Sequence, residues 1–243
     1  MDYLNNLSEQ TKLCSDTPMA KEHPSKDFSA DLAQRVMAEV QFTGGDRRQS
    51  GAAQPGGVTL HHEGAIDSAS LPAGWQRSQS EAENSSLRTL SVFHPNCDQS
   101  VSISIHDARV PLPPAAAAAF HQLLENHAAR SYAPLTDELQ AIEPVLRVMN
   151  VGDNQYTNPP SANNEFPPSF HMQSCQVQQL NGRAVLAVEG RFGAQGQGSP
   201  FRGIFIERGD RVEGIAYEAA DLQSYLRHSG AFNGMLRSIK WSG

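Results

Sequence analysis

The sequence predicts an α+β fold, with a mostly antiparallel, six-stranded sheet, helices packed on both faces and a flexible N-terminal arm. Three observations predict it. Strand-like runs occur in pairs that turn residues join, which is typical of antiparallel hairpins. Two longer stretches carry apolar residues at helical spacing. Residues 184–188 (AVLAV) and 203–206 (GIFI) are apolar on both sides of the strand, which indicates a sheet covered on both faces.

Residues 1–70 are predicted to form the flexible arm. One amphipathic helix is expected over 27–42, where these apolar residues recur at helical spacing: Phe28, Leu32, Val36, Met37 and Val40. The stretch that follows is rich in Gly, Gln and Ser, which is the composition of a linker. Two fates stay open for this helix, because it can pack against the body of the protein or bind a partner.

Residues 71–243 are predicted to form a single sandwich domain that begins near Trp75, a large apolar anchor. The first hairpin is expected over 85–110, with its turn at 95–98. The expected partners across it are Leu90 with Ile105, Val92 with Ile103, and His94 with Val101. This register places the apolar residues on one face and the Ser and Thr side chains on the other.

A helix is expected after Pro113 and Pro114, because five alanines in a row favour helix and proline suits a helix start. Its predicted buried face consists of Phe120, Leu123, Leu124 and His127. Residues 150–169 are rich in Asn, Pro and Ser, and they are predicted to form a long surface loop.

The second hairpin turns at Asn181-Gly182, which is the strongest turn signal in the chain and predicts type I′. Its expected partners are Val177 with Leu186 and Cys175 with Val188. A third hairpin follows over 201–219, where Gly203 and Gly214 within the strands predict the close approach of another layer.

The chain is expected to end with an amphipathic helix that Asp221 caps. Its predicted apolar stripe consists of Leu222, Tyr225, Leu226, Ser229, Phe232 and Leu236. A short apolar tail with Ile239 and Trp241 follows it.

Three segments together resemble a known superfamily: LNGRAVLAVEG, GIFIERGDRVEGIAYEA and the closing LRSIKW. In their order and spacing they are similar to the PsbP-like α/β/α sandwich proteins. That superfamily includes the extrinsic photosystem subunit, the nuclear Ran-binding Mog proteins and bacterial DcrB-type proteins. The resemblance covers 71–243, and it implies a role in binding or assembly. These proteins share no active site, so the resemblance assigns no functional residue.

Charge and composition exclude several classes of partner. The formal net charge is −7 and no cluster of Lys or Arg occurs, so neither nucleic acid nor an anionic membrane surface is an expected partner. No Sec signal peptide and no membrane-spanning run are recognisable, which predicts a soluble, cytoplasmic chain; export without such a signal stays open. The three cysteines, Cys14, Cys97 and Cys175, are expected to be free thiols.

No metal, cofactor or catalytic residue is expected. The densest candidate for metal is His61-His62-Glu63, but neighbouring side chains on an extended chain point to opposite sides. The glycine-rich stretch 190–203 connects two strands, so no helix N-terminus would face a bound phosphate.

The sequence therefore favours a non-enzymatic protein-binding or adaptor protein of bacterial type, accessory to a secretion or toxin-immunity system. The predicted partner-binding residues are Tyr156 and Phe166 in the long loop, and Arg191, Arg202 and Arg208 on the C-terminal strands. The alternative is a ligand-binding or hydrolase-like enzyme with a pocket between sheet and helix, using His106, Asp107 and His171. The two hypotheses differ in whether these last three residues converge in space.

Overall fold

The computed structural model describes residues 57–78, 87–151, 170–193 and 198–242. All described residues belong to one compact unit, Ala53–Gly243. The helix predicted over 27–42 and most of the loop predicted over 150–169 lie outside the described residues. No helix in the described part of the chain is long and apolar enough to cross a membrane.

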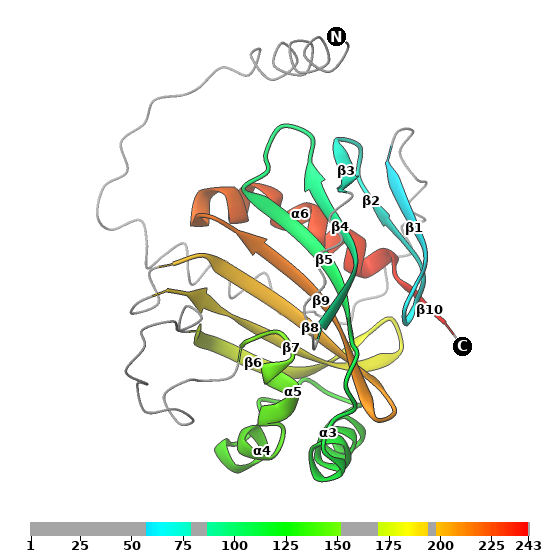
Figure 1. The fold of residues 1–243 in the computed structure, drawn as a ribbon, viewed down its shortest axis with the longest axis vertical. Helices are drawn as coiled ribbons and strands as arrows, with labels where there is room; N and C mark the ends of the chain where they lie inside the picture. Colours follow the sequence, from blue (N-terminus) through cyan, green and yellow to red (C-terminus); the bar gives the residue numbers. More distant parts are fainter. Residues whose placement is uncertain (1–56, 79–86, 152–169, 194–197, 243) are drawn as a thin grey trace. The chain divides into compact units, whose positions relative to one another are not determined.

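The main sheet is antiparallel, has seven strands, and runs in the order β3-β4-β5-β9-β8-β7-β6 (Figure 1). Its strands are β3 (Trp75–Ser78), β4 (Leu87–Pro95), β5 (Val101–Ala108), β6 (Phe170–Leu180), β7 (Arg183–Phe192), β8 (Pro200–Arg208) and β9 (Arg211–Ala219). The predicted α+β class is confirmed, but the predicted number of six strands is wrong. The additional strand is β3, in which the residues after Trp75 pair with the end of β4.

A second, three-stranded sheet consists of β1 (Val58–Glu63), β2 (Ile66–Leu71) and β10 (Lys240–Trp241). Its hairpin lies in the stretch that was expected to be arm, so the predicted boundary at residue 70 is wrong. Leu60 and Ile66 are almost completely buried, because this small sheet packs against the main one through a shared apolar core. The folded body therefore includes residue 58.

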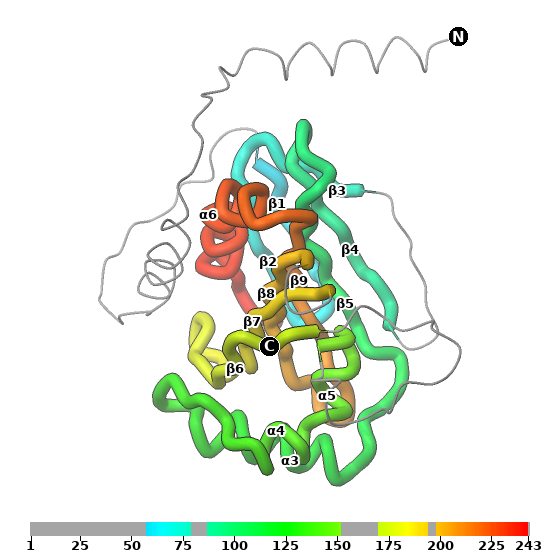
Figure 2. Tube along the Cα trace, turned by 90° about the vertical axis from the view of Figure 1, so that its left-hand side faces the viewer, coloured from blue at the N-terminus to red at the C-terminus, as the bar shows by residue number. Residues whose placement is uncertain are grey.

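Two apolar cores cover the two faces of the main sheet. The first lies under α6 (Leu222–Ser238) and the small sheet, and the second lies under α3 (Pro114–Asn126), α4 (Thr136–Ala141) and α5 (Glu143–Arg147). Alternate residues of each central strand enter alternate cores, as Ile204 and Phe205 of β8 do. Figure 2 shows α3–α5 grouped together and apart from α6.

The hairpin of β6 and β7 has the predicted register, with Val177 opposite Leu186 and Cys175 opposite Val188. Asn181 and Gly182 have φ angles of 50° and 85°, as a type I′ turn requires. The Asn181 side chain also donates hydrogen bonds to the carbonyls of Leu236 and Ile239, at 2.8 and 2.9 Å. The turn therefore ties the sheet to the end of α6.

The hairpin of β4 and β5 departs from the predicted register. A β-bulge between Thr89 and Ser91 shifts every later pair by one residue, so Val92 faces Ser104 and Phe93 faces Ile103. Shifting a strand by one residue exchanges its two faces. Phe93 therefore enters the core, and Val92 joins the Ser and Thr side chains on the opposite face.

The predicted close approach at Gly203 and Gly214 is confirmed. A Cβ atom on Gly214 would lie 2.5 Å from Sδ of Met149, and one on Gly203 would lie 3.0 Å from its Cε. Met149 follows α5, so the two glycines allow this helical layer to contact the sheet.

The closing helix α6 begins as predicted, because the Asp221 carboxylate accepts a hydrogen bond from the backbone N–H of Ser224 at 2.9 Å. Its apolar stripe differs at two places. Leu222 is 40% exposed, whereas Met235, which the prediction omitted, is fully buried beside Phe232. In α3, the predicted Phe120, Leu123 and Leu124 are buried.

Candidate partner-binding face

One half of the main sheet lies outside the core under α3–α5. That core takes residues from β6, β7, β8 and β9, and it includes none from the described residues of β3, β4 and β5. The register of these three strands places one set of side chains on this side: Gln76, Ser78, Leu87, Thr89, Val92, His94, Ser102, Ser104, His106 and Ala108. We call this set the polar sheet face. In Figure 1, β4 and β5 extend well beyond α3–α5.

The polar sheet face has an unusual composition for a surface. It contains no Lys, Arg, Asp or Glu, although charged residues make up 19% of the chain. Most of its side chains are short hydroxyls or imidazoles, which donate and accept hydrogen bonds. Depletion of charged residues distinguishes the centre of protein interfaces from the rest of the surface.

A chain of hydrogen bonds runs through this face. Oγ of Ser104 lies 2.7 Å from Nε2 of His106, and Oγ1 of Thr89 lies 3.3 Å from Nδ1 of the same ring. Burial lowers the pKa of His106 to about 4, so the imidazole is neutral at pH 7. Nearby, Nδ1 of His94 donates to the carbonyl of Val101 at 2.7 Å. The ring of His106 is therefore fixed and already desolvated.

Contact between a serine hydroxyl and an imidazole is also the geometry of an activated nucleophile. Two features of Ser104 and His106 weaken that chemistry. A lowered pKa makes His106 a poor proton acceptor, and its second nitrogen meets the hydroxyl of Thr89 where a carboxylate would stabilise an imidazolium. Recognition through hydrogen bonds fits these groups better than acyl transfer does.

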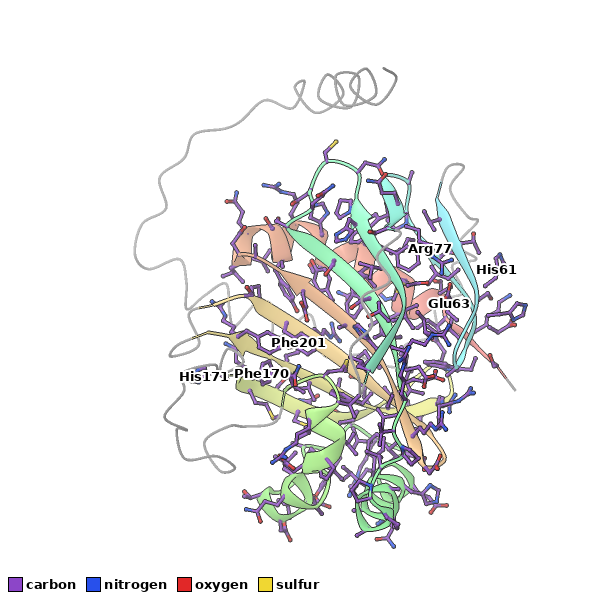
Figure 3. The ribbon with its side chains drawn as sticks, viewed as in Figure 1. His61, Glu63, Arg77, Phe170, His171 and Phe201 are labelled. Carbon is purple, nitrogen blue, oxygen red and sulfur yellow. The ribbon has the colours of Figure 1, made fainter. Side chains whose placement is uncertain are left out.

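The residues of the alternative enzyme hypothesis do not converge. His106 and Asp107 are neighbours on β5, so their side chains point to opposite faces of the sheet. His171 lies on β6, four strand positions away from β5, which corresponds to roughly 19 Å. Figure 3 shows His171 beside Phe170 at that side of the sheet. The convergence that the alternative enzyme hypothesis requires is therefore not found for these three residues.

The predicted arginines do not form one exposed surface. Arg202 is only 4% exposed; its Nε lies 3.1 Å from Oε1 of Glu189, and its Nη1 donates to Oδ1 of Asn233 in α6 at 3.0 Å. A partner on the surface cannot reach it, so the prediction is wrong for Arg202. Arg208 pairs with Glu213 at 3.2 Å, and Arg191 is half-buried on β7. Tyr156 and Phe166 lie outside the described residues.

One ion pair and one hydrogen bond join the small sheet to the main one. Oε1 of Glu63 lies 2.8 Å from Nη2 of Arg77, and Figure 3 shows both side chains. Glu213 accepts a hydrogen bond from the backbone N–H of Ala65, and burial raises the pKa of its carboxyl. These carboxylates have partners within the fold, which gives them a structural role.

The structure also describes the metal candidate at His61-His62-Glu63 and two of the three cysteines. His61 and His62 have ring centroids 6.5 Å apart, and His62 pairs with Asp67. Among the described residues, no group of three or more His, Cys, Asp or Glu side chains could hold a metal. Cys175 is free and buried, as expected. Cys14 lies outside the described residues.

Sequence reasoning missed the polar sheet face as a site. A usable signal was present, because the stretch SISIH over 102–106 alternates small polar and apolar residues and ends in a histidine. Alternation of this kind places every polar side chain on one face of a strand. The bulge in β4 then decides which residues of that strand join them.

The comparisons with known proteins show a similarity of fold only. No family model matches the chain, and no curated protein matches it. Among solved structures, cyanobacterial PsbP from Synechocystis sp. is 9% identical to this chain, with a TM-score of 0.44. The match covers 82% of this chain and 98% of the PsbP chain. PA94 of Pseudomonas aeruginosa, of unknown function, is 12% identical with a TM-score of 0.36, covering 77% and 98%.

A third neighbour is LpqN of Mycobacterium tuberculosis, described as involved in cell envelope biogenesis. It is 12% identical with a TM-score of 0.41, covering 77% of this chain and 91% of its own. All three have the PsbP-like fold, which is the resemblance that the sequence carries.

Proposed function

We propose that this chain is a non-enzymatic protein-binding module that receives a partner protein on the polar sheet face. One observation carries the proposal. The polar sheet face lies outside the core under α3–α5, yet it carries no charged side chain, although charged residues make up 19% of the chain. A sheet face that only meets water is normally rich in long charged residues, whereas the centre of a protein interface is not.

The chemistry of the face indicates what it receives. Ser102, Ser104 and Thr89 are short, so the backbone of a partner can approach the sheet closely. Their hydroxyls donate and accept, and His106 stays neutral, so the face suits a polar, uncharged segment of protein. His106 is already desolvated in the free protein, and a partner therefore incurs little further desolvation cost there.

The test is a substitution in the middle of the face. Ser102→Arg adds a long charged side chain to a half-buried position, whereas Thr59→Arg adds it to an exposed position on β1. Proteins that bind the immobilised full chain in lysate of its own host are identified by mass spectrometry. We expect one partner to bind the wild type and Thr59→Arg and to be lost with Ser102→Arg. Equal recovery with all three would contradict the proposal.

The adaptor role, and its setting in a bacterial secretion or toxin-immunity system, remain predictions from the sequence. They become testable once the partner is identified. A secreted effector or a toxin bound at the polar sheet face would support them. A housekeeping enzyme bound there would support the binding function and contradict this setting.

A second candidate function rests on the 2.7 Å contact between Ser104 and His106. If these residues form a hydrolase site, a fluorophosphonate probe should label Ser104, and His106→Asn should abolish the labelling. We expect no labelling, because His106 is a weak base. Labelling that depends on His106 would favour the enzyme and would overturn the assignment of this face to partner binding alone.

A further inference from the structure

Glu218 of β9 is a charged side chain at the border of the polar sheet face. In the register of β5 and β9 it lies directly opposite Ser102, and residues opposite each other on antiparallel strands point to the same side of the sheet. Ala216, two residues earlier on β9, lies opposite Ser104 and is buried in the core under α3–α5. Glu218 itself is exposed. It therefore stands where the polar sheet face meets the edge of that core.

Glu218 differs from the other glutamates of the main sheet in having no partner. Each of the other three is paired with a basic side chain, at 2.9 to 3.2 Å: Glu189 with Arg202, Glu207 with His121, and Glu213 with Arg208. On β8, the residue opposite Glu218 is Phe201, a buried ring that offers no hydrogen bond. No residue that the structure describes forms a hydrogen bond or an ion pair with the Glu218 carboxylate.

The carboxylate of Glu218 is also poorly hydrated. The strands around it partly desolvate the carboxyl and raise its pKa, even though the side chain keeps contact with solvent. A partner that covers the polar sheet face removes more of this water. Covering a carboxylate without a counter-ion is strongly unfavourable, whereas a covered ion pair with additional hydrogen bonds can be net favourable.

We infer that the partner segment received by the polar sheet face places an Arg or Lys side chain against Glu218. This inference rests on the proposed function and adds the charge of the partner to it. The hydroxyl of Ser102 lies on the same side of the sheet, so a guanidinium or ammonium group can donate to the carboxylate and to this hydroxyl together. The expected segment is uncharged over β4 and β5 and carries a positive charge where it reaches β9.

The experiment selects peptides from a phage-displayed library of random sequences on the immobilised full chain. Peptides that bind the polar sheet face are those enriched on the wild type and not on Ser102→Arg. We expect Arg or Lys to be enriched at one position of these peptides. Glu218→Gln should raise their dissociation constants about tenfold. Glu218→Arg should instead select peptides with Asp or Glu at that position.

Matched controls are made at Glu125 on α3, whose side chain is 72% exposed and which is not part of the polar sheet face. Glu125→Gln and Glu125→Arg change the net charge of −7 by the same amounts as the two substitutions at Glu218. Both controls should bind the selected peptides as the wild type does. They separate pairing at Glu218 from the attraction of basic peptides to an acidic chain as a whole.

The outcomes distinguish this inference from the proposed function. Peptides that are lost with Ser102→Arg but carry no basic residue would overturn the pairing with Glu218 and still support binding at the polar sheet face. Basic peptides that bind Glu218→Gln as tightly as the wild type, or that weaken equally with Glu125→Gln, would also overturn the pairing. A library without any peptide enriched on the wild type over Ser102→Arg would count against both. Circular dichroism shows that each variant is folded.

Discussion

The carboxylate of Glu213 accepts a hydrogen bond from the backbone N–H of Ala65, which lies 148 residues earlier in the chain. The contact joins the turn of the small sheet to β9 of the main sheet. Gly64, directly before Ala65, has a φ of +60°, and a Cβ atom there would lie 2.6 Å from Oε2 of Glu213. The absence of a side chain at Gly64 therefore makes room for the buried carboxylate.

Gly64→Ala should destabilise the protein more than Gly209→Ala does. Both glycines have a positive φ, +60° and +66°, so each substitution incurs the backbone penalty of about 1 kcal/mol. Only position 64 has a neighbour in the way, since nothing lies within 4 Å of a Cβ atom at Gly209. We expect an additional loss of about 2 kcal/mol at position 64, because Glu213 must give up its buried hydrogen bond. Urea denaturation measures both, and equal losses would contradict this account.

His106 should make stability depend on pH. Its pKa falls from 6.5 in the unfolded chain to about 4 in the folded protein, so the unfolded state binds the proton more tightly. The contribution of neutral His106 to the free energy of unfolding is fully present above pH 6.5. It decreases as the pH falls towards 4, by about 3 kcal/mol in total. His106→Gln should remove this part of the pH dependence, and His94→Gln tests whether the effect is specific. Parallel curves for wild type and His106→Gln between pH 7 and 4 would refute it.

Cys175 should be unreactive in the folded protein. Burial raises the pKa of its thiol to about 12, so almost no thiolate exists at pH 8. Iodoacetamide at pH 8 should leave Cys175 unmodified for hours under native conditions and modify it within minutes in 6 M guanidinium, as peptide mass spectrometry would show. Rapid native modification would mean that this part of β6 opens readily.

Two truncations should separate the arm from the folded body. Removing 1–52 deletes none of the described residues, and we expect cooperative thermal unfolding to be retained. Removing 1–70 also deletes β1 and most of β2, including Leu60 and Ile66 from the core. Burial of one such side chain contributes about 1.5–3 kcal/mol, so we expect a loss of several kcal/mol or of cooperativity. Similar unfolding of both truncated chains would argue against the boundary near residue 53.

The sequence predicted the parts of the fold in which local chemistry determines the geometry. Asn181-Gly182 admits a two-residue turn, and that turn sets the register of β6 and β7 as far as the irregularity between Met172 and Ser174. The bulge in β4 has no such signal, because Leu90 and Val92 alternate as they would in a regular strand. The hairpin of β1 and β2 was missed because its strands are short and polar, with His61, His62 and Glu63 close together.

The candidate site was harder to predict than the fold. Arg202 appears on a strand among other arginines, and its burial depends on Glu189 and Asn233, which the packing of β7 and α6 brings beside it. His106 was recognised as a candidate, but with the wrong neighbours. Asp107 is adjacent in sequence and faces away, whereas Ser104 and Thr89 share its face through the pleat and the cross-strand register.

Met149 fills the space that Gly203 and Gly214 leave on two neighbouring strands. Its terminal methyl group lies against β8 and β9 together, and Met149 is buried in the core under α3–α5. Carbon-13 labelling of methionine methyls would therefore give an NMR resonance for this one position inside the molecule. Its chemical shift would report, without any engineered probe, whether the helical layer and the sheet stay in contact when a partner arrives.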